Sequence, residues 1–138
     1  MLRRNQKVEL IRQVPLFADL SKRELEEIAS IADEIDFAEG KELIREGARG
    51  REFFVLLDGA VDVTQDGHRI NQLGAGDFFG EIALVLPDCV RTATVTASTP
   101  VEALVVTGQD FHSLLQRSSS IELKVMKAAA SRLGPAGL

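Results

Sequence analysis

GDFFGEIALVLPDCVRTATV, residues 76–95, is a mostly apolar segment that also contains a single glutamate, Glu81, and, ten residues later, a single arginine, Arg91. Apolar segments rarely keep Glu and Arg unless the two are paired or functional. The composition of this segment therefore predicts a specific task for both side chains, either as a mutual ion pair or as two parts of a binding site.

The chemistry of these residues suits a phosphate group and a sugar. Gly80 permits a positive φ or a close backbone approach, and residues 81–84 favour one short helical turn that Pro87 would end. The start of a helix presents unpaired N–H groups to an anion, and Arg91 on the next strand could bind two phosphate oxygens at once. A carboxylate such as Glu81 accepts hydrogen bonds from sugar hydroxyls. A site with both abilities fits a nucleotide.

The regions on either side have the periodicity of helices. In residues 1–35 apolar side chains recur at helical spacing, and Ser21 followed by Glu24 has the spacing of a capping box that starts a second helix. Helical patterning returns in residues 108–134. We therefore expect helices before and after the central part of the chain.

Residues 36–107 have the features of a β-roll. Eight of the eleven glycines fall between Gly40 and Gly80, where they separate short runs of apolar and β-branched residues. Asp66-Gly67 between two such runs predicts a tight hairpin turn. Short strands at this spacing favour a sandwich, barrel or jelly roll. We expect one domain, residues 1–138, with a mainly β fold and flanking helices.

Composition excludes several classes of function. The net charge of −5 provides no basic field for nucleic acid or an anionic membrane, and no apolar run approaches the ~20 residues that span a bilayer. The single cysteine, Cys89, excludes an internal disulfide, and His68 and His112 have no evident partners for a metal or for catalysis. A cupin enzyme, which is also a jelly roll, needs several His ligands. We expect a cytoplasmic binding protein without catalytic activity and without a cofactor or metal.

The sequence resembles the cyclic nucleotide-binding domains of the bacterial catabolite activator, the protein kinase A regulatory subunits and gated ion channels. The family signature F-G-E-[IL]-A-L followed by R-[TSA]-A-T occurs as FGEIAL (79–84) and RTAT (91–94), with the Glu-to-Arg spacing of the bacterial activator. VPLFADLSKRELEEIA (14–29), LIREGARGREFFVLLDGAVDV (43–63) and DFHSLL (110–115) extend the resemblance over nearly the whole chain. It implies an eight-stranded antiparallel jelly roll (a double-stranded β-helix) with N-terminal helices and two C-terminal helices.

The resemblance also implies roles for single residues of the phosphate-binding cassette, residues 76–95. In the family the arginine binds the cyclic phosphate and the glutamate accepts the ribose 2′-hydroxyl, which assigns Arg91 and Glu81. The residues implied at the phosphate are Arg91, Thr92, Gly80, Ile82 and Ala83. An ordinary strand threonine is the alternative for Thr92, and a mutual ion pair in a degenerate, empty site is the alternative for Glu81 and Arg91.

The C-terminal helices are implied to carry the signal and to cover the base. Leu84 and Phe111 match a leucine and an aromatic residue that form the family's hinge, with plain core packing as the alternative. The candidate base-lid residues are Arg132, Met126 and Ala129, with Val125 as further apolar cover. For Arg132, interaction with the helix dipole is the alternative.

The expected ligand is cAMP, or else cGMP, because the Glu-to-Arg spacing resembles domains that mostly bind cAMP while the Thr92 hydroxyl suits either nucleotide. The expected partner is an effector domain or a protein outside this chain, and a homodimer is possible. Three interpretations stay open: the sensor region of a larger protein, a stand-alone binding protein, and a degenerate domain that serves as an interaction scaffold.

Overall fold

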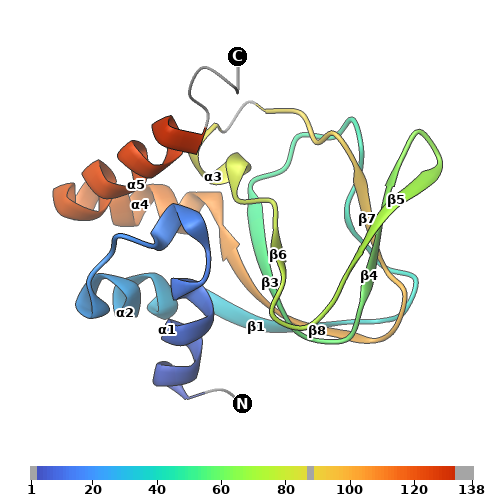
Figure 1. Ribbon diagram of the computed structural model, residues 1–138, viewed down its shortest axis with the longest axis horizontal. Coiled ribbons are helices and arrows are strands. Elements are labelled where there is room, and N and C mark those ends of the chain that lie inside the picture. Colours follow the sequence, from blue (N-terminus) through green and yellow to red (C-terminus); the bar gives the residue numbers. More distant parts are fainter. Residues whose placement is uncertain (1–2, 87–88, 133–138) are drawn as a thin grey trace.

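The structure of the chain, a computed structural model, describes residues 3–86 and 89–132. Its strands form a roll, and helices gather at one end of this roll (Figure 1). The strands are β1 (Ala32–Phe37), β2 (Glu42–Ile44), β3 (Glu52–Asp58), β4 (Val61–Gln65), β5 (His68–Leu73), β6 (Phe78–Phe79), β7 (Thr94–Ala97) and β8 (Val101–Thr107). The helices are α1 (Arg4–Arg12), the 3-10 helix η1 (Pro15–Phe17), α2 (Lys22–Ser30), α3 (Ile82–Val85), α4 (Gly108–Arg117) and α5 (Ser119–Arg132).

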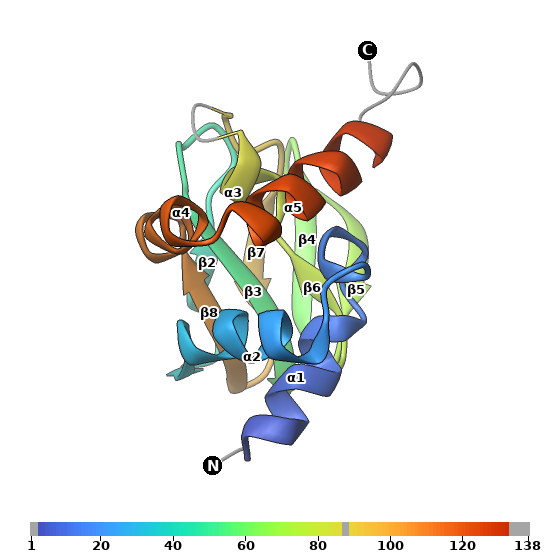
Figure 2. The same cartoon turned by 90° about the vertical axis from the view of Figure 1, so that its left-hand side faces the viewer.

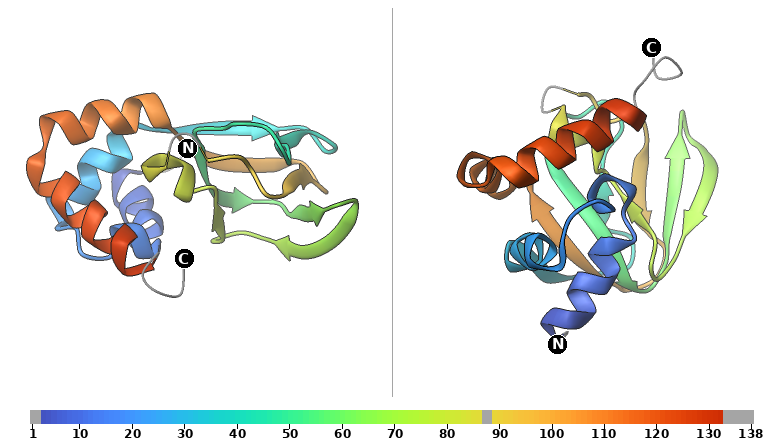
Figure 3. Two further views of the ribbon diagram at one scale, coloured as in Figure 1. Left: turned by 90° about the horizontal axis from the view of Figure 1, so that it is seen from above. Right: turned by 60° about the vertical axis from the view of Figure 1, so that its left-hand side comes forward.

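The strands are arranged in two antiparallel sheets. One sheet has the strand order β1-β8-β3-β6 and the other the order β2-β7-β4-β5. Seen from above in Figure 3, both sheets extend away from the cluster of helices. The predicted mainly β fold, an eight-stranded antiparallel jelly roll with flanking helices, is confirmed.

Strand β3 is buried on both faces, which explains why its sequence is a continuous apolar run. Side chains alternate along a strand, so Phe53 and Val55 point to the helices while Phe54 and Leu56 point into the roll. Its neighbour β8 divides its side chains between the same two cores. The two strands thus form the wall that separates the helical end of the domain from the interior of the roll.

Local sequence signals fix the first helices and the hairpin. The Ser21 hydroxyl accepts from the Glu24 N–H at 3.2 Å, and the Glu24 carboxylate accepts from the Ser21 N–H at 2.8 Å, so the predicted capping box is confirmed. The Asp66-Gly67 turn is also confirmed: Gln65 pairs with His68, and φ is 52° at Asp66 and 81° at Gly67.

The predicted helical region is wrong at its C-terminal end. Helix α2 ends at Ser30, and residues 32–35 belong to strand β1 instead. Ala32 pairs with Val106 and Phe37 with Val101, so the edge of β8 provides hydrogen-bond partners for this segment. A long-range pairing overrides the local helical pattern here.

The helical end is held together by aromatic packing and by one buried carboxylate. The Phe17 ring of η1 lies 5.9 Å, centroid to centroid, from both Phe53 of β3 and Phe111 of α4. The Glu24 carboxylate of α2 accepts hydrogen bonds from Lys124 Nζ, at 2.7 Å, and from the Ser120 hydroxyl, both on α5. Figure 2 shows α5 running across this end of the domain above α1 and α2.

Candidate functional site

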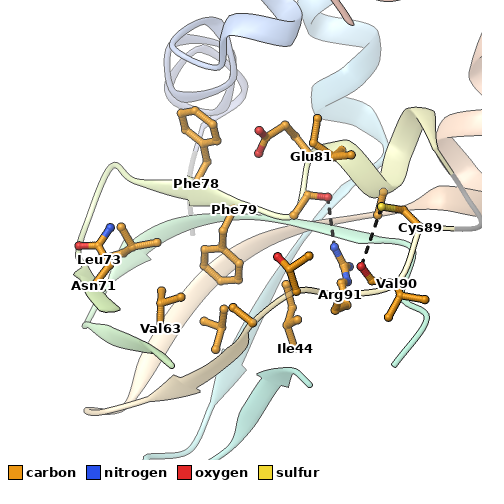
Figure 4. A pocket seen from close by; sticks show the side chains of 16 residues that line it. Ile44, Val63, Asn71, Leu73, Phe78, Phe79, Glu81, Cys89, Val90 and Arg91 are labelled. Carbon is orange, nitrogen blue, oxygen red and sulfur yellow. Dashed lines mark hydrogen bonds between the residues drawn. The ribbon is translucent and has the colours of Figure 1, made fainter. Parts of the chain in front are cut away.

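A pocket of about 530 Å³ lies between the β6–α3 segment and the strands of the second sheet (Figure 4). The jelly roll brings the two ends of the predicted cassette together at this pocket. All the residues predicted to contact phosphate or ribose line it: Gly80, Glu81, Ile82, Ala83, Arg91 and Thr92.

Arg91 reaches into the pocket wall and donates to main-chain oxygens. Its Nη2 lies 2.7 Å from the Glu52 carbonyl oxygen, and its Nη1 makes a longer contact of 3.5 Å with the Gly80 carbonyl oxygen. A guanidinium has five N–H donors in a planar fork. Donors therefore remain for an anion in the pocket, and the carbonyls hold the plane of the guanidinium in place.

The surroundings of Arg91 act on its charge in opposite directions. Burial lowers the pKa of the Arg91 guanidinium from its ordinary value, whereas the nearby Glu52 carboxylate and the Cys89 side chain raise it. Arginine stays protonated at any physiological pH, so the site keeps its positive charge. A partly desolvated cation interacts more strongly with an anion than one in bulk water does.

Gly80 is the point where β6 turns into α3. Its φ of 87° lies in the left-handed region, and a Cβ at this position would lie 2.8 Å from the Glu52 carbonyl oxygen. Glycine is thus required both by the backbone conformation and by the close approach of β3. Within the turn that follows, the Ala83 N–H donates to the Gly80 carbonyl at 3.2 Å, so this predicted phosphate-binding amide is already engaged.

Glu81 lines the same pocket but does not pair with Arg91. Its side chain is buried, and in Figure 4 its carboxylate is directed away from the Arg91 guanidinium. Among the residues that the structure describes, the hydrogen bonds of that guanidinium run to carbonyl oxygens. The structure therefore does not contain the mutual Glu81–Arg91 ion pair, and the roles of both residues in a binding site stay predictions.

The region around this pocket also matches a family of known proteins. The family model of the cyclic nucleotide-binding domain matches residues 34–118, which include most of β1, all the other strands, α3 and all of α4. The chain belongs to the cyclic nucleotide-binding domain family. The family is a regulatory binding domain, so the site is a candidate binding site rather than an active site.

Two curated relatives carry this domain inside longer chains. A cGMP-dependent protein kinase of Drosophila melanogaster, isozyme 2, is 33% identical over 130 residues, which cover 88% of this chain and 14% of the kinase. A cyclic nucleotide-gated potassium channel of Rhizobium etli is 36% identical over 126 residues, which cover 91% of this chain and 35% of the channel. The chain thus spans a minor part of the length of these relatives.

Two solved structures resemble the cyclic nucleotide-binding domain described here. The N-terminal domain of a transcriptional regulator from Streptomyces coelicolor superposes with a TM-score of 0.79 at 29% identity, over 90% of this chain and 91% of that one. The cAMP-bound PfPKA-R superposes with a TM-score of 0.68 at 27% identity, over 98% of this chain and 48% of that one.

The candidate hinge residues of the domain lie in one core. Leu84 on α3 and Phe111 on α4 are both buried and belong to the core at the helical end, where α3 contacts α4 and α5. A displacement of α3 would therefore act on both C-terminal helices. Thr92, by contrast, is exposed at the pocket, where its hydroxyl is available to a ligand or to water.

The described candidate lid residues, Val125, Met126 and Ala129, do not line the pocket in this arrangement. Val125 and Ala129 are buried in the helical core, and Met126 is 41% exposed on another surface of α5. The side chain of Arg132 lies outside the described residues. α5 would have to move for Met126 or Ala129 to cover a ligand, and their lid role stays a prediction.

Sequence reasoning missed the part of the pocket wall that lies outside the cassette, residues 76–95. This part consists of the apolar side chains of Ile44, Val63 and Leu73, together with Asn71, whose side chain lies at the end away from Arg91 (Figure 4). The alternation of inward and outward residues on β4 could have identified Val63. Ile44 and Asn71 depend on how distant strands meet, for which the local pattern gives no signal.

The described residues show neither a metal-binding cluster nor a helix suited to a membrane. They contain no group of three or more His, Cys, Asp or Glu side chains arranged to hold a metal ion. Among the same residues, every helix is too short or too polar to cross a membrane.

Proposed function

We propose that this chain is a cytoplasmic sensor that binds a cyclic nucleotide reversibly and passes the binding event to an effector domain or partner protein. The observation that carries the proposal is the pocket where the Arg91 guanidinium meets the turn of Gly80 and α3, inside the region that matches the family. Its volume of about 530 Å³ suits a small ligand.

The two ends of the pocket differ in chemistry in the way that a nucleotide requires. The cyclic phosphate would bind the free N–H donors of Arg91, with the Thr92 hydroxyl and the Gly80 and Ile82 N–H groups beside it, whereas the Ala83 N–H is engaged by the Gly80 carbonyl. The apolar wall of Ile44, Val63 and Val95 would contact the sugar and the base. Glu81 would turn into the pocket to accept the ribose 2′-hydroxyl.

The preferred ligand is cAMP, with cGMP as the competitor. The cAMP-bound state of PfPKA-R, which covers nearly the whole chain in superposition, supports cAMP. The cGMP-dependent kinase among the relatives supports cGMP, and the Thr92 hydroxyl can serve either nucleotide. Their relative affinities are therefore the first quantity to measure.

Transmission would run from α3 to the C-terminal helices. Phosphate binding acts on the turn at Gly80, α3 carries Leu84 into the helical core, and α4 and α5 repack in response. An effector domain or partner protein would then sense α5. Sedimentation velocity with and without nucleotide tests whether a homodimer is part of this response.

Parallel calorimetric titrations with cAMP and cGMP test the proposal directly. We expect one-site binding, with tighter binding of cAMP. A nucleotide present at 100 times its Kd should also raise the free energy of unfolding by about 2.7 kcal/mol, measured as a thermal shift. The absence of both signals with either nucleotide at millimolar concentration would contradict the proposal and favour a degenerate scaffold.

A further inference from the structure

We propose that Gly50 is a positioning residue for Arg91, and that residues 47–52 form a seat that sets the direction of the guanidinium. The seat deepens the proposed function, because its effect on a nucleotide requires that Arg91 binds the cyclic phosphate. Gly50 lies before β3, far from the cassette in sequence, and the family signature around Glu81 and Arg91 does not include it.

The main chain of Arg91 is fixed to this segment on both sides. The Arg91 N–H donates to the Ala48 carbonyl at 2.9 Å, and the Gly47 N–H donates to the Arg91 carbonyl at 2.8 Å. Next to them, Arg49 and Val90 form an antiparallel bridge. The Cα of Arg91 therefore has a defined position opposite the seat, and its side chain must run along the residues that follow.

The side chain of Arg91 crosses Gly50 in contact with it. A Cβ added to Gly50 would lie 2.6 Å from Nε, 2.9 Å from Nη2 and 3.1 Å from Cζ of Arg91. Two residues further along, the Glu52 carbonyl accepts from Nη2 at 2.7 Å. The guanidinium thus occupies the space that any other residue at position 50 would fill, and the carbonyl of the same segment orients it.

The backbone at Gly50 does not itself require glycine. Gly47 and Gly80 have φ values of 85° and 87°, in the left-handed region, whereas Gly50 is not among the glycines with positive φ. An alanine is conformationally allowed there. The contact with Arg91 is therefore the physical reason for a glycine at this position.

A methyl group added at Gly50 would displace the side chain of Arg91 rather than disturb the backbone of the domain. The atoms nearest to it belong to the flexible end of a side chain, which can shift at little cost in stability. The shift would move Nη2 away from the Glu52 carbonyl and rotate the plane of the fork. Binding of phosphate by a guanidinium depends on this plane, because the donors act as a pair.

Gly50→Ala is the test, and Gly74→Ala is its matched control, because Gly74 has no positive φ and no atom lies within 4 Å of the place that an added methyl group would take. For Gly50→Ala we expect about tenfold weaker binding of cAMP and cGMP by calorimetry. Without nucleotide, its thermal midpoint should not fall. Gly74→Ala should bind like wild type.

Combination with Arg91→Ala separates positioning from a general structural effect. In the Arg91→Ala background, Gly50→Ala should change the residual affinity no further, since the group it displaces is gone. The proposed role of Gly50 would be contradicted by unchanged nucleotide affinity in Gly50→Ala. It would also be contradicted if Gly50→Ala caused the same loss of affinity in the Arg91→Ala background.

A second measurement does not depend on any ligand. The Nε–H resonance of Arg91, assigned by its loss in Arg91→Lys, should shift in Gly50→Ala and stay in place in Gly74→Ala. If wild type binds neither nucleotide, the proposed function fails while this resonance still tests the seat. An unchanged Nε–H resonance in Gly50→Ala would contradict the proposed positioning of Arg91 by Gly50, whether or not nucleotide binds.

Discussion

Arg91 is suited to phosphate because of its shape as much as its charge. Two main-chain carbonyls hold the plane of its guanidinium, and donors remain on the side of the pocket. A lysine would supply the charge without the planar fork. Substitution of Arg91 by lysine therefore separates the contribution of the planar guanidinium from that of the positive charge.

Arg91→Lys should weaken cAMP and cGMP binding by about tenfold, and Arg91→Ala on the order of a hundredfold, since bonds to a charged group are lost in each case. Isothermal calorimetry measures both. Arg45→Ala is the control: its side chain is 75% exposed and pairs with Glu42 at 3.1 Å, away from the pocket. Wild-type affinity in Arg91→Ala would show that phosphate binds elsewhere.

Glu24 is a second side chain whose pKa is changed by its surroundings. Hydrogen bonds from Lys124, Ser120 and the Ser21 N–H lower the pKa of its carboxyl from 4.5 to about 2. A group with a lowered pKa in the folded state stabilises the fold above its unfolded pKa and loses that contribution in acid. The stabilisation by Glu24 should therefore be complete at neutral pH and fade between pH 4.5 and about 2.

Glu24→Gln should lower the free energy of unfolding at pH 7 by about 1–2 kcal/mol, a modest amount because Lys124 is partly exposed to solvent. The difference from wild type should shrink as the pH falls below 4.5. Urea denaturation at a series of pH values measures it. Glu27→Gln, on the exposed face of the same helix, should leave stability and its pH profile unchanged. A difference that is constant with pH would contradict the role of the charge.

Single residues of the site could be predicted from the sequence only where a short motif carries them. The cassette contains Gly80, Glu81 and, ten residues after Glu81, Arg91, and the structure brings them to one pocket. Ile44 reaches the same pocket through strand pairing, and Gly50 meets Arg91 next to the bridge between Arg49 and Val90. The direction of the Glu81 side chain depends on packing against other elements, which no local pattern encodes.

At the scale of elements, α3 links the pocket to the C-terminal helices. Its first residue, Ile82, lines the pocket, whereas Leu84, two residues later, lies in the core that contains Phe111. Because α3 is only four residues long, we expect a displacement of its first residue to displace Leu84 as well. We therefore expect that shortening Leu84 changes the response of α4 and α5 to the ligand rather than the affinity for the ligand.

Leu84→Ala should cost about 2 kcal/mol of stability and should disconnect α4 and α5 from the ligand. Hydrogen exchange of these two helices, which we expect to change on addition of cAMP in wild type, should change far less in the variant, while the affinity stays within about threefold. Leu123→Ala, at a position 59% exposed on α5, is the control and should behave like wild type. An undiminished exchange response in Leu84→Ala would contradict the hinge role.

Elements with local determinants were predictable, and those with distant partners were not. The capping box at Ser21 and the Asp66-Gly67 turn follow from a few residues each. Strand β1 was not predicted at residues 32–35, because its conformation depends on pairing with β8, some seventy positions away. The packing of α5 likewise depends on η1, α3 and α4 together, so its placement relative to the pocket has no local signal in the sequence.

In the whole molecule, stability should be highest along the wall between the two cores. β3 and β8 are buried on both faces and pair with each other. In contrast, β5 is an edge strand whose residues are largely exposed. Opening of the edge exposes little apolar surface, whereas opening of the wall disrupts both cores at once.

Native-state hydrogen exchange should therefore find the slowest amides in β3 and β8, at the rate set by global unfolding, and faster exchange in β5. The urea dependence of exchange provides the internal control, since global opening exposes more surface than local opening does. Exchange of β8 that is faster than global unfolding would show that the roll and the helical end unfold separately.

The carboxylate of Glu24 also couples the N-terminal helices to the last helix. It fastens α2 to α5 through Ser120 and Lys124, and α2 packs against α1. A rotation of α5 would therefore displace α1 and α2 as well. A domain fused before α1 would then move together with one fused after α5, so that a ligand-dependent movement of α5 could be transmitted at both ends of the domain.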